Sequence, residues 1–274
     1  MKIKKMRHRG RSGSPDRGEA APKLSAYEDL YICGINPVTE ALKSGGRVLS
    51  LFVLRQTSGH VRHLIDIAGL KHIPVRAVER DFFVGRFEKG HQGIAASVTP
   101  KKIIDIDDLL DLAFSRGADP FFVVLDCIED PRNFGAILRV ADAAGADGVV
   151  FQSRRSAGLS PVVYKASAGA VEHVNISEVV NIKHALSKMK ERDVIIVGAE
   201  AGSPVGPWDA DLTPPVALVM GSEGEGLRRT VRDMCDMIVT LPMKGAVNSL
   251  NVSVATGVIA YEVMRQRQIR SLMA

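Results

Sequence analysis

Three short segments of this 274-residue chain place polar side chains and glycine directly after an apolar run. The first, residues 130–139 (Asp-Pro-Arg-Asn-Phe-Gly-Ala-Ile-Leu-Arg), follows the apolar run 121–125. We therefore expect it at the carboxyl end of a buried strand, where α/β proteins bind ligands. Asn133 is suited to cap a helix, Gly135 allows another backbone to approach, and Arg139 lies nearly two turns further along. A cap, a packing glycine and a solvated arginine would explain the same residues without a site.

The second segment is the glycine-rich stretch 221–226 (Gly-Ser-Glu-Gly-Glu-Gly), between the apolar run 216–220 and an expected helix. Loops of this kind often receive a ligand on their backbone N–H groups. Its spacing is neither GxGxxG nor GxxxxGK[ST], which excludes the dinucleotide-binding and P-loop patterns. The carboxylates of Glu223 and Glu225 also disfavour a phosphate ligand.

The third segment runs from 241 to 255, where an expected strand ends in a polar stretch before a long helix. Asn248 or Ser249 would serve as an ordinary N-cap. Asn251 and Ser253, however, fall in the expected first turn, where apolar packing residues would be usual. Such a local departure from the packing pattern is typical of a functional site.

Together the three segments resemble the SpoU (TrmH-like) branch of the SPOUT RNA ribose 2′-O-methyltransferases. The matching stretches are NFGAILR at 133–139, MGSEGEGL at 220–227, LPMKG at 241–245 and NSLNVSVATGVIAYE at 248–262. The amino-terminal part is similar to the family's substrate-binding domain, from CGINPVTEAL at 33–42 to HQGIAA at 91–96. Within the family, the domain pairing is most similar to bacterial enzymes that methylate a guanosine in the peptidyl-transferase loop of large-subunit rRNA; mitochondrial and chloroplast counterparts are similar.

The resemblance implies S-adenosylmethionine (AdoMet) as co-substrate, with no metal and no second cofactor. AdoMet would bind within a deep trefoil knot formed by the second and third segments, although topology rules alone argue against a knot. The expected cofactor-binding residues are Gly221, Leu241 and Leu250, which match bracketing positions, with Met243 and Gly245 lining the same pocket. The family is dimeric, with its active site near the dimer interface.

The resemblance also implies a catalytic set of Arg139, Asn133, Glu223, Ser249 and Asn251. A guanidinium keeps its proton at neutral pH, which makes Arg139 a poor base. We expect Arg139 to bind the adjacent phosphate and to stabilise the developing alkoxide. The other four side chains are expected to hold the ribose hydroxyl, orient Arg139 and shape the AdoMet pocket.

The spacing of apolar residues predicts two α/β parts after a basic arm at 1–27. Residues 28–98 form a small α/β domain, L30e-like and RNA-binding by resemblance, and 99–107 form a linker. Residues 108–274 form the methyltransferase domain, a parallel sheet with helices on both faces. Strands are expected at 49–54, 74–78, 93–98, 121–125, 148–151, 194–199, 216–220 and 237–241, and helices at 37–43, 61–68, 134–144, 182–190, 227–234 and 250–267.

The positive charge is concentrated at the amino terminus. Residues 1–23 hold eight of the 36 Lys and Arg residues and two of the 31 Asp and Glu residues, so 28 basic and 29 acidic residues remain for the rest. Such an arm commonly holds nucleic-acid phosphates without reading sequence. An inert tail and a mitochondrial presequence remain open as explanations.

Cysteine usage and hydropathy restrict the compartment. Cys33, Cys127 and Cys235 lie far apart without a CxxC pair, which argues against zinc and against a disulfide framework. No apolar run reaches the roughly 18 residues of a membrane span. We therefore expect a bacterial cytoplasmic protein with no membrane partner. A mitochondrial location is the less favoured alternative.

The sequence thus predicts an enzyme, an AdoMet-dependent RNA (guanosine-2′-O-)-methyltransferase that acts as a homodimer on ribosomal RNA. A tRNA ribose 2′-O-methyltransferase is an alternative. A non-catalytic RNA-binding ribosome-assembly factor is another, but it would be expected to have lost Arg139, Glu223 or Asn251. An oxidoreductase would need a GxGxxG loop after its first strand, and the sequence has none there.

Overall fold

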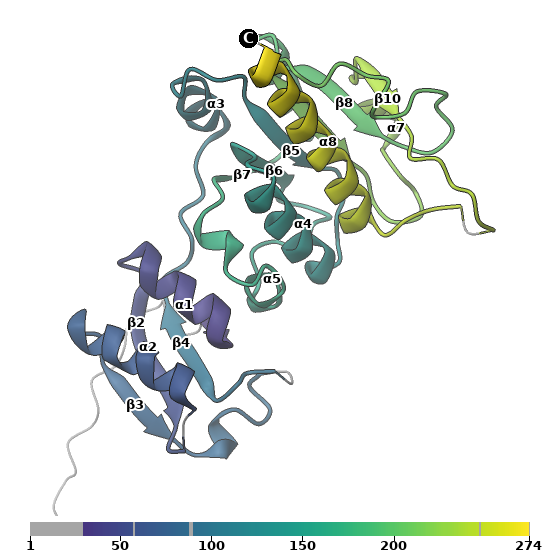
Figure 1. Cartoon of the computed structure of the whole chain (residues 1–274). Coiled ribbons are helices and arrows are strands. Elements are labelled where there is room, and N and C mark those ends of the chain that lie inside the picture. Colours follow the sequence, from purple (N-terminus) through teal and green to yellow (C-terminus); the bar gives the residue numbers. More distant parts are fainter. Residues whose placement is uncertain (1–29, 57, 88–89, 247, 274) are drawn as a thin grey trace, which may run out of the picture.

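The computed structural model describes residues 30–56, 58–87, 90–246 and 248–273, in two α/β parts (Figure 1). The predicted basic arm therefore lies outside the described residues. The elements of the amino-terminal part are β1 (Tyr31–Cys33), α1 (Ile35–Ser44), β2 (Val48–Leu54), α2 (Gly59–Leu70), β3 (Val75–Val78), the 3-10 turn η1 (Arg80–Phe82) and β4 (Ile94–Val98).

The small sheet has the order β1-β4-β2-β3, with β2 and β3 parallel and the other pairs antiparallel. Helices α1 and α2 bury Val38 and Leu64 in one core cluster with Leu51, whereas Phe52 belongs to a separate aromatic cluster. This alternation along β2 puts the helices on one face of the sheet and the aromatic rings on the other. The small domain thus folds as an α/β unit, as its apolar spacing predicts.

The carboxyl-terminal part is larger. Its elements are α3 (Ile106–Phe114), β5 (Phe121–Leu125), α4 (Pro131–Ala143), β6 (Gly148–Gln152), α5 (Pro161–Ala166), η2 (Ala170–Glu172), β7 (Ile176–Val179), α6 (Ile182–Lys190), β8 (Ile195–Ala199), β9 (Val216–Met220), α7 (Arg229–Arg232), β10 (Met237–Val239) and α8 (Val252–Met273).

The large sheet has six strands in the order β10-β8-β9-β5-β6-β7, and all neighbours are parallel. Both faces of its central strand β5 are buried: Phe121 and Leu125 pack in the cluster that includes α4 and α8, and Phe122 packs in the cluster that includes α3 and α6. The predicted parallel sheet with helices on both faces is confirmed. The trefoil knot stays a prediction.

Several local expectations are wrong. Strand β7 is not among the expected strands, because its sequence Ile-Ser-Glu-Val has no continuous apolar run. Helix α4 begins at Pro131, and its N-cap is Asp130, whose side chain accepts from Arg132 N, so Asn133 is not the cap. Helix α8 begins at Val252, two residues later than expected, which leaves Asn251 just outside the helix.

The two parts meet through polar contacts around η2 and α5, which lies between them in Figure 1. The half-buried ammonium of Lys101 donates to Glu172 O at 2.8 Å, and burial lowers the pKa of Lys101. Arg47 pairs with the Glu172 carboxylate at 3.5 Å, where both side chains are largely buried. Strand β4 ends at Val98; the exact domain boundaries stay a prediction.

Candidate active site

The site lies at the carboxyl edge of the large sheet. Because its strands are parallel, the segments that follow β5, β6, β8 and β9 emerge on the same side. After β5, α4 packs closely on α5: a Cβ added at Gly135 would lie 2.5 Å from Ala166 Cβ and 2.8 Å from Val163 O. Gly135 is therefore a packing glycine that holds the start of α4 in place.

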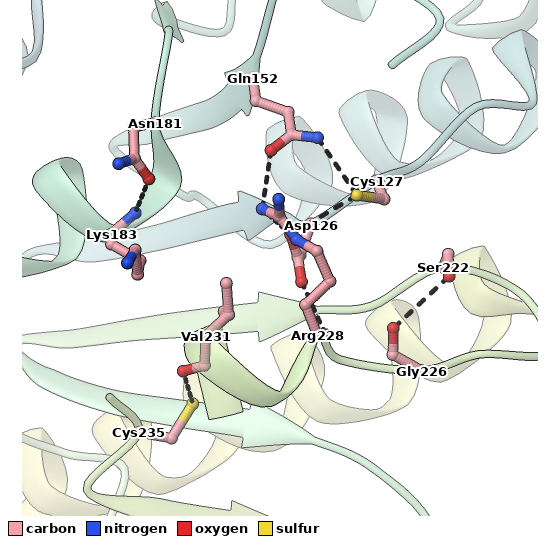
Figure 2. Close-up of polar contacts among 10 residues, drawn as sticks. All are labelled: Asp126, Cys127, Gln152, Asn181, Lys183, Ser222, Gly226, Arg228, Val231 and Cys235. Carbon is pink, nitrogen blue, oxygen red and sulfur yellow. Dashed lines mark hydrogen bonds and ion pairs between the residues drawn. The ribbon is translucent and has the colours of Figure 1, made fainter. Parts of the chain in front are cut away.

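After β9, the glycine-rich loop closes on itself. Ser222 N donates to Gly226 O at 3.1 Å, and Gly226 N donates to Ser222 O at 3.0 Å (Figure 2 shows these residues). A Cβ at Gly221 would lie 2.2 Å from the Gly226 carbonyl carbon, and Gly224 has a φ of 88°. Only glycine fits such positions without strain, so the loop needs these glycines to adopt this shape.

Before α8, Asn251 caps the helix. Its Oδ1 accepts from Ser253 N at 2.9 Å and from Ser253 Oγ at 2.6 Å. This use of Oδ1 fixes the orientation of the amide and directs Nδ2 away from the helix. The polar residues that depart from the packing pattern therefore hold the helix start in place.

The three segments meet in one polar cluster, Asn133, Glu223 and Asn251. Asn251 Nδ2 donates to Asn133 Oδ1 at 2.9 Å and to Glu223 Oε1 at 3.0 Å. Asn133 Nδ2, from an almost fully buried side chain, donates to the same Glu223 oxygen. Within the described residues, Glu223 Oε2 has no hydrogen bond, so this oxygen can still accept one from a ligand.

A cavity of about 750 Å³ opens beside this cluster. Its size is in the range of small-molecule sites. The predicted cofactor-binding residues Gly221, Leu241, Met243 and Leu250 all line it, and so does the predicted catalytic Ser249. Gly245 is exposed and is not among its lining residues.

The composition of this cavity favours a ligand with an apolar body and a positive charge. Apolar side chains such as Val239 and Ile259 line it together with the carboxylates of Glu200, Glu223 and Glu225. Glu200 is paired with Arg232 Nε at 2.8 Å, but the carboxylates of Glu223 and Glu225 have no ion pair within the described residues and would repel a phosphate and attract a sulfonium or an ammonium. Within the described ranges, no group of three or more His, Cys, Asp or Glu side chains is arranged to hold a metal ion.

Arg139 is not part of the cluster. It lies six residues after Asn133, which turns it about 240° around α4. Its side chain is exposed, and it makes no hydrogen bond or ion pair within the part of the chain that the structure describes. Of the five predicted catalytic residues, the structure joins Asn133, Glu223 and Asn251 by hydrogen bonds, places Ser249 on the cavity wall, and leaves Arg139 outside.

A second network is not predicted from the sequence. Asp126, fully buried at the end of β5, accepts from Arg228 Nε at 2.7 Å and from Arg228 N at 3.0 Å. Arg228 Nη2 donates to Gln152 Oε1 at 2.8 Å, and Gln152 Nε2 contacts Cys127 Sγ at 3.2 Å (Figure 2). Burial, together with the Asp126 charge, raises the pKa of the Cys127 thiol. The one sequence signal that could have pointed to this network is Asp126, a single carboxylate directly after the apolar strand 121–125.

The chain is similar in sequence to known proteins over both of its α/β parts. The family model described as "SpoU rRNA Methylase family" matches residues 120–261, and the model described as "RNA 2'-O ribose methyltransferase substrate binding" matches residues 31–103. A 23S rRNA (guanosine-2'-O-)-methyltransferase RlmB of Pseudomonas putida is 41% identical over 249 residues, covering 90% of this chain and 100% of the relative. A putative TrmH family tRNA/rRNA methyltransferase, YacO of Bacillus subtilis, is 41% identical, covering 86% of this chain and 96% of the relative.

Solved structures show the same fold. The SpoU methyltransferase AviRb of Streptomyces viridochromogenes, in complex with the cofactor AdoMet, matches with a TM-score of 0.74 and 26% identity. The match covers 87% of this chain and 90% of AviRb. The agreement therefore includes both α/β parts in one arrangement.

Proposed function

The chain belongs to the SpoU rRNA methylase family, and we propose that it transfers a methyl group from AdoMet to the ribose 2′-hydroxyl of a guanosine in 23S-type ribosomal RNA. The relatives named RlmB carry this reaction in their names, and AviRb was solved with AdoMet. The observation that supports the proposal most strongly is the Asn133–Glu223–Asn251 cluster on the edge of the 750 Å³ cavity.

The cavity residues fit AdoMet. Gly221, Leu241, Met243 and Leu250 are the proposed binding residues, and the nearby carboxylates complement a positive charge. Gly245 stays in the proposal only as a residue of the loop that bears Met243. When bound, AdoMet supplies an electrophilic methyl group on a sulfonium.

The cluster is suited to hold the ribose. A 2′-hydroxyl is a weak nucleophile that must be positioned and must lose its proton. Glu223 Oε2 is the acceptor left open for that proton, since Oε1 already receives two amide N–H groups. We assign Asn133 and Asn251 to orient Glu223, Ser249 to contact the ribose or the cofactor, and Arg139 to bind the adjacent phosphate.

A homodimer is part of the proposal. Helix α8 buries Ile259 and Val263 in the core, yet Val254, Val258 and Tyr261 on its other side are 52%, 45% and 47% exposed. An apolar stripe of this kind on a regular helix is typical of a subunit interface.

The dimer would also give Arg139 a place in the reaction. Helices α4 and α8 pack together, with the position of a Cβ at Gly257 3.7 Å from Val140 Cγ2. Arg139 directly precedes Val140 on α4, and its side chain is exposed. We infer that Arg139 of one subunit serves the cluster of the other.

The remaining parts of the proposal concern the substrate. Residues 28–98 are assigned to bind RNA, 99–107 to link, and 108–274 to carry out methyl transfer. The arm 1–27 is assigned to phosphate contacts. The relatives named RlmB are bacterial, which supports action in the bacterial cytoplasm. Among the described residues, no helix is both long and apolar enough to cross a membrane.

The decisive experiment maps ribose methylation across total RNA from cells with and without the gene. We expect one guanosine in large-subunit rRNA to lose its 2′-O-methyl group in the deletion strain and to regain it on complementation. Loss at a tRNA position instead would assign the enzyme to tRNA. No change at any position would refute the proposed activity.

A further inference from the structure

A second cavity, of about 490 Å³, adjoins the cofactor cavity at the glycine-rich loop. The two cavities share Ser222, Glu223, Glu225 and Val252 as lining residues. Asn133 also lines the second one. A ribose held at the cluster would therefore adjoin both cavities. The base is the part of the target nucleotide for which we propose the second cavity.

The second cavity contains an arginine whose position is fixed. Arg228 lines it, and its Nε and Nη2 are both used by the buried residues Asp126 and Gln152. The orientation of Gln152 is itself fixed, because its Nε2 contacts Cys127 Sγ (Figure 2). Arg228 remains 36% exposed, and its Nη1 makes no hydrogen bond within the described residues. A guanidinium held in this way presents donors without further loss of side-chain freedom.

Carboxylates face the same space. Glu129 and Glu225 line the cavity, are exposed, and accept no hydrogen bond within the described part of the chain. Guanine offers acceptors at O6 and N7 on one side and N–H donors at N1 and N2 on the other. An arginine suits the first pair and a carboxylate suits the second. A phosphate would meet these carboxylates unfavourably, and adenine would present its N6 amino group in place of the O6 acceptor, although it keeps N7.

We infer that this cavity binds the guanine base of the target nucleotide, with Arg228 Nη1 donating to the O6 and N7 side and with Glu129 or Glu225 accepting from N1–H and N2–H. The inference rests on the proposed function, because the ribose must lie at the Asn133–Glu223–Asn251 cluster. Arg228 is then a specificity-determining residue, and Asp126 and Gln152 are positioning residues that act through it. The target base has to leave its stack to enter the cavity.

The test uses an RNA fragment that contains the mapped guanosine, synthesised with guanosine, 7-deazaguanosine, inosine or adenosine at that position. Methyl transfer by the full-length protein is measured under single-turnover conditions. We expect 7-deazaguanosine, which lacks the N7 acceptor, and inosine, which lacks the N2 amine, each to slow transfer roughly tenfold. Adenosine should be slower still, because it has an amino group in place of the O6 acceptor, an acceptor in place of N1–H, and no N2 amine.

Arg228→Lys is the informative variant, because it keeps a positive charge beside the buried Asp126 but removes the Nη1 donor that Asp126 and Gln152 hold in place. It should methylate guanosine and 7-deazaguanosine at equal, reduced rates, while its affinity for AdoMet stays near the wild-type value; its thermal midpoint should fall, because the buried Asp126 loses the Nε hydrogen bond. Arg229→Lys is the matched control: Arg229 is the exposed next residue, does not line the cavity, and should retain wild-type discrimination.

The outcomes separate the two proposals. If the wild-type protein methylates guanosine but accepts all four bases at one rate, the base-reading assignment is wrong and the methyltransferase assignment stands. If it methylates none of the four, the proposed function itself fails. If Arg228→Lys does not fold, the wild-type rates on the four RNAs still decide whether the base is read.

Discussion

Asn251 donates a hydrogen bond to Asn133 across 2.9 Å, although 118 positions separate the two residues in the chain. Asn251 lies just before α8 and Asn133 in the first turn of α4, and both also donate to Glu223 in the loop after β9. The proposed methyl transfer therefore depends on three segments that only the parallel sheet brings together. Each segment can be tested separately.

The cofactor prediction follows from the cavity beside Gly221. Calorimetry should show saturable AdoMet binding and no NAD binding, because three carboxylates line the cavity and the loop lacks the GxGxxG spacing. Gly221→Ala should abolish AdoMet binding, since the added Cβ would collide with the Gly226 backbone. Gly202→Ala is the control for the effect of replacing a glycine outside the loop 221–226. A Cβ there would meet open space, so the variant should show only the backbone strain that its φ of 95° causes. Saturable NAD binding without any AdoMet binding would contradict the assignment of AdoMet as the co-substrate.

Asn251 has two tasks that different substitutions separate. Asn251→Asp keeps the cap on α8 but loses both amide donations and brings a carboxylate next to Glu223. Asn251→Ala loses both the cap and the donations, and loss of the cap should lower the free energy of unfolding by about 1 kcal/mol. We expect both variants to slow methyl transfer by roughly tenfold or more, and both to lower the thermal midpoint, the alanine variant through the lost cap and the aspartate variant through repulsion by Glu223. An active aspartate variant would remove Asn251 from the catalytic set.

The sequence predicts the elements of the site better than its connections. The apolar runs locate β5 and β9, since buried parallel strands need continuous apolar residues. They miss β7, whose Ser177 and Glu178 interrupt the run. Family motifs identify Asn133, but its hydrogen bonds depend on tertiary contacts that spacing does not encode.

The position of Arg228 shows the same limit. It follows the glycine-rich loop as an ordinary helix-flanking arginine, and its role depends on Asp126, 102 positions away. Arg139 is the opposite case, a residue that the motif singles out but that the fold leaves exposed. Sequence spacing on one helix therefore does not predict which side chains share a site.

The basic arm should add affinity without adding specificity. Residues 1–23 carry eight Lys and Arg residues among Gly, Ser and Pro, so they can meet phosphates but are not expected to read bases. Deleting them should weaken RNA binding most at low salt and flatten the slope of log affinity against log salt, because fewer counterions are released. The methylated nucleotide should stay the same. Methylation at new positions would mean that the arm takes part in selecting the target nucleotide. Unchanged RNA affinity would mean that the arm is a passive tail or a cleaved segment.

Arg139 should be essential for transfer but not for cofactor binding, because it lies outside the cofactor cavity. Arg139→Ala should abolish methyl transfer and leave the AdoMet dissociation constant within about twofold. Arg139→Lys should fail as well, since an ammonium cannot reproduce a two-pronged contact with phosphate. Arg132→Lys, on the same helix, is the matched control. Full activity of Arg139→Lys would contradict the phosphate role.

The apolar stripe of α8 predicts an obligate homodimer. Light scattering at micromolar concentration should report about twice the chain mass of 29.6 kDa. Val258→Glu should split the dimer, because it places a charge in the middle of the stripe between Val254 and Tyr261. Asp142→Ala, an exposed substitution on α4, should leave the mass unchanged. An active monomer would refute an interface on this face.

Mixed dimers test whether Arg139 acts across that interface. Alone, Arg139→Ala should be inactive and Asn251→Ala should retain at most about a tenth of wild-type activity. If Arg139 of one subunit serves the Asn251 cluster of the other, a mixed dimer contains one intact site and one doubly damaged site. Equal amounts, unfolded and refolded together, give mixed dimers in half of the population, so about a quarter of wild-type activity should return. If both residues act within one subunit, every site carries one of the two substitutions and mixing restores no activity, which would assign Arg139 to its own subunit.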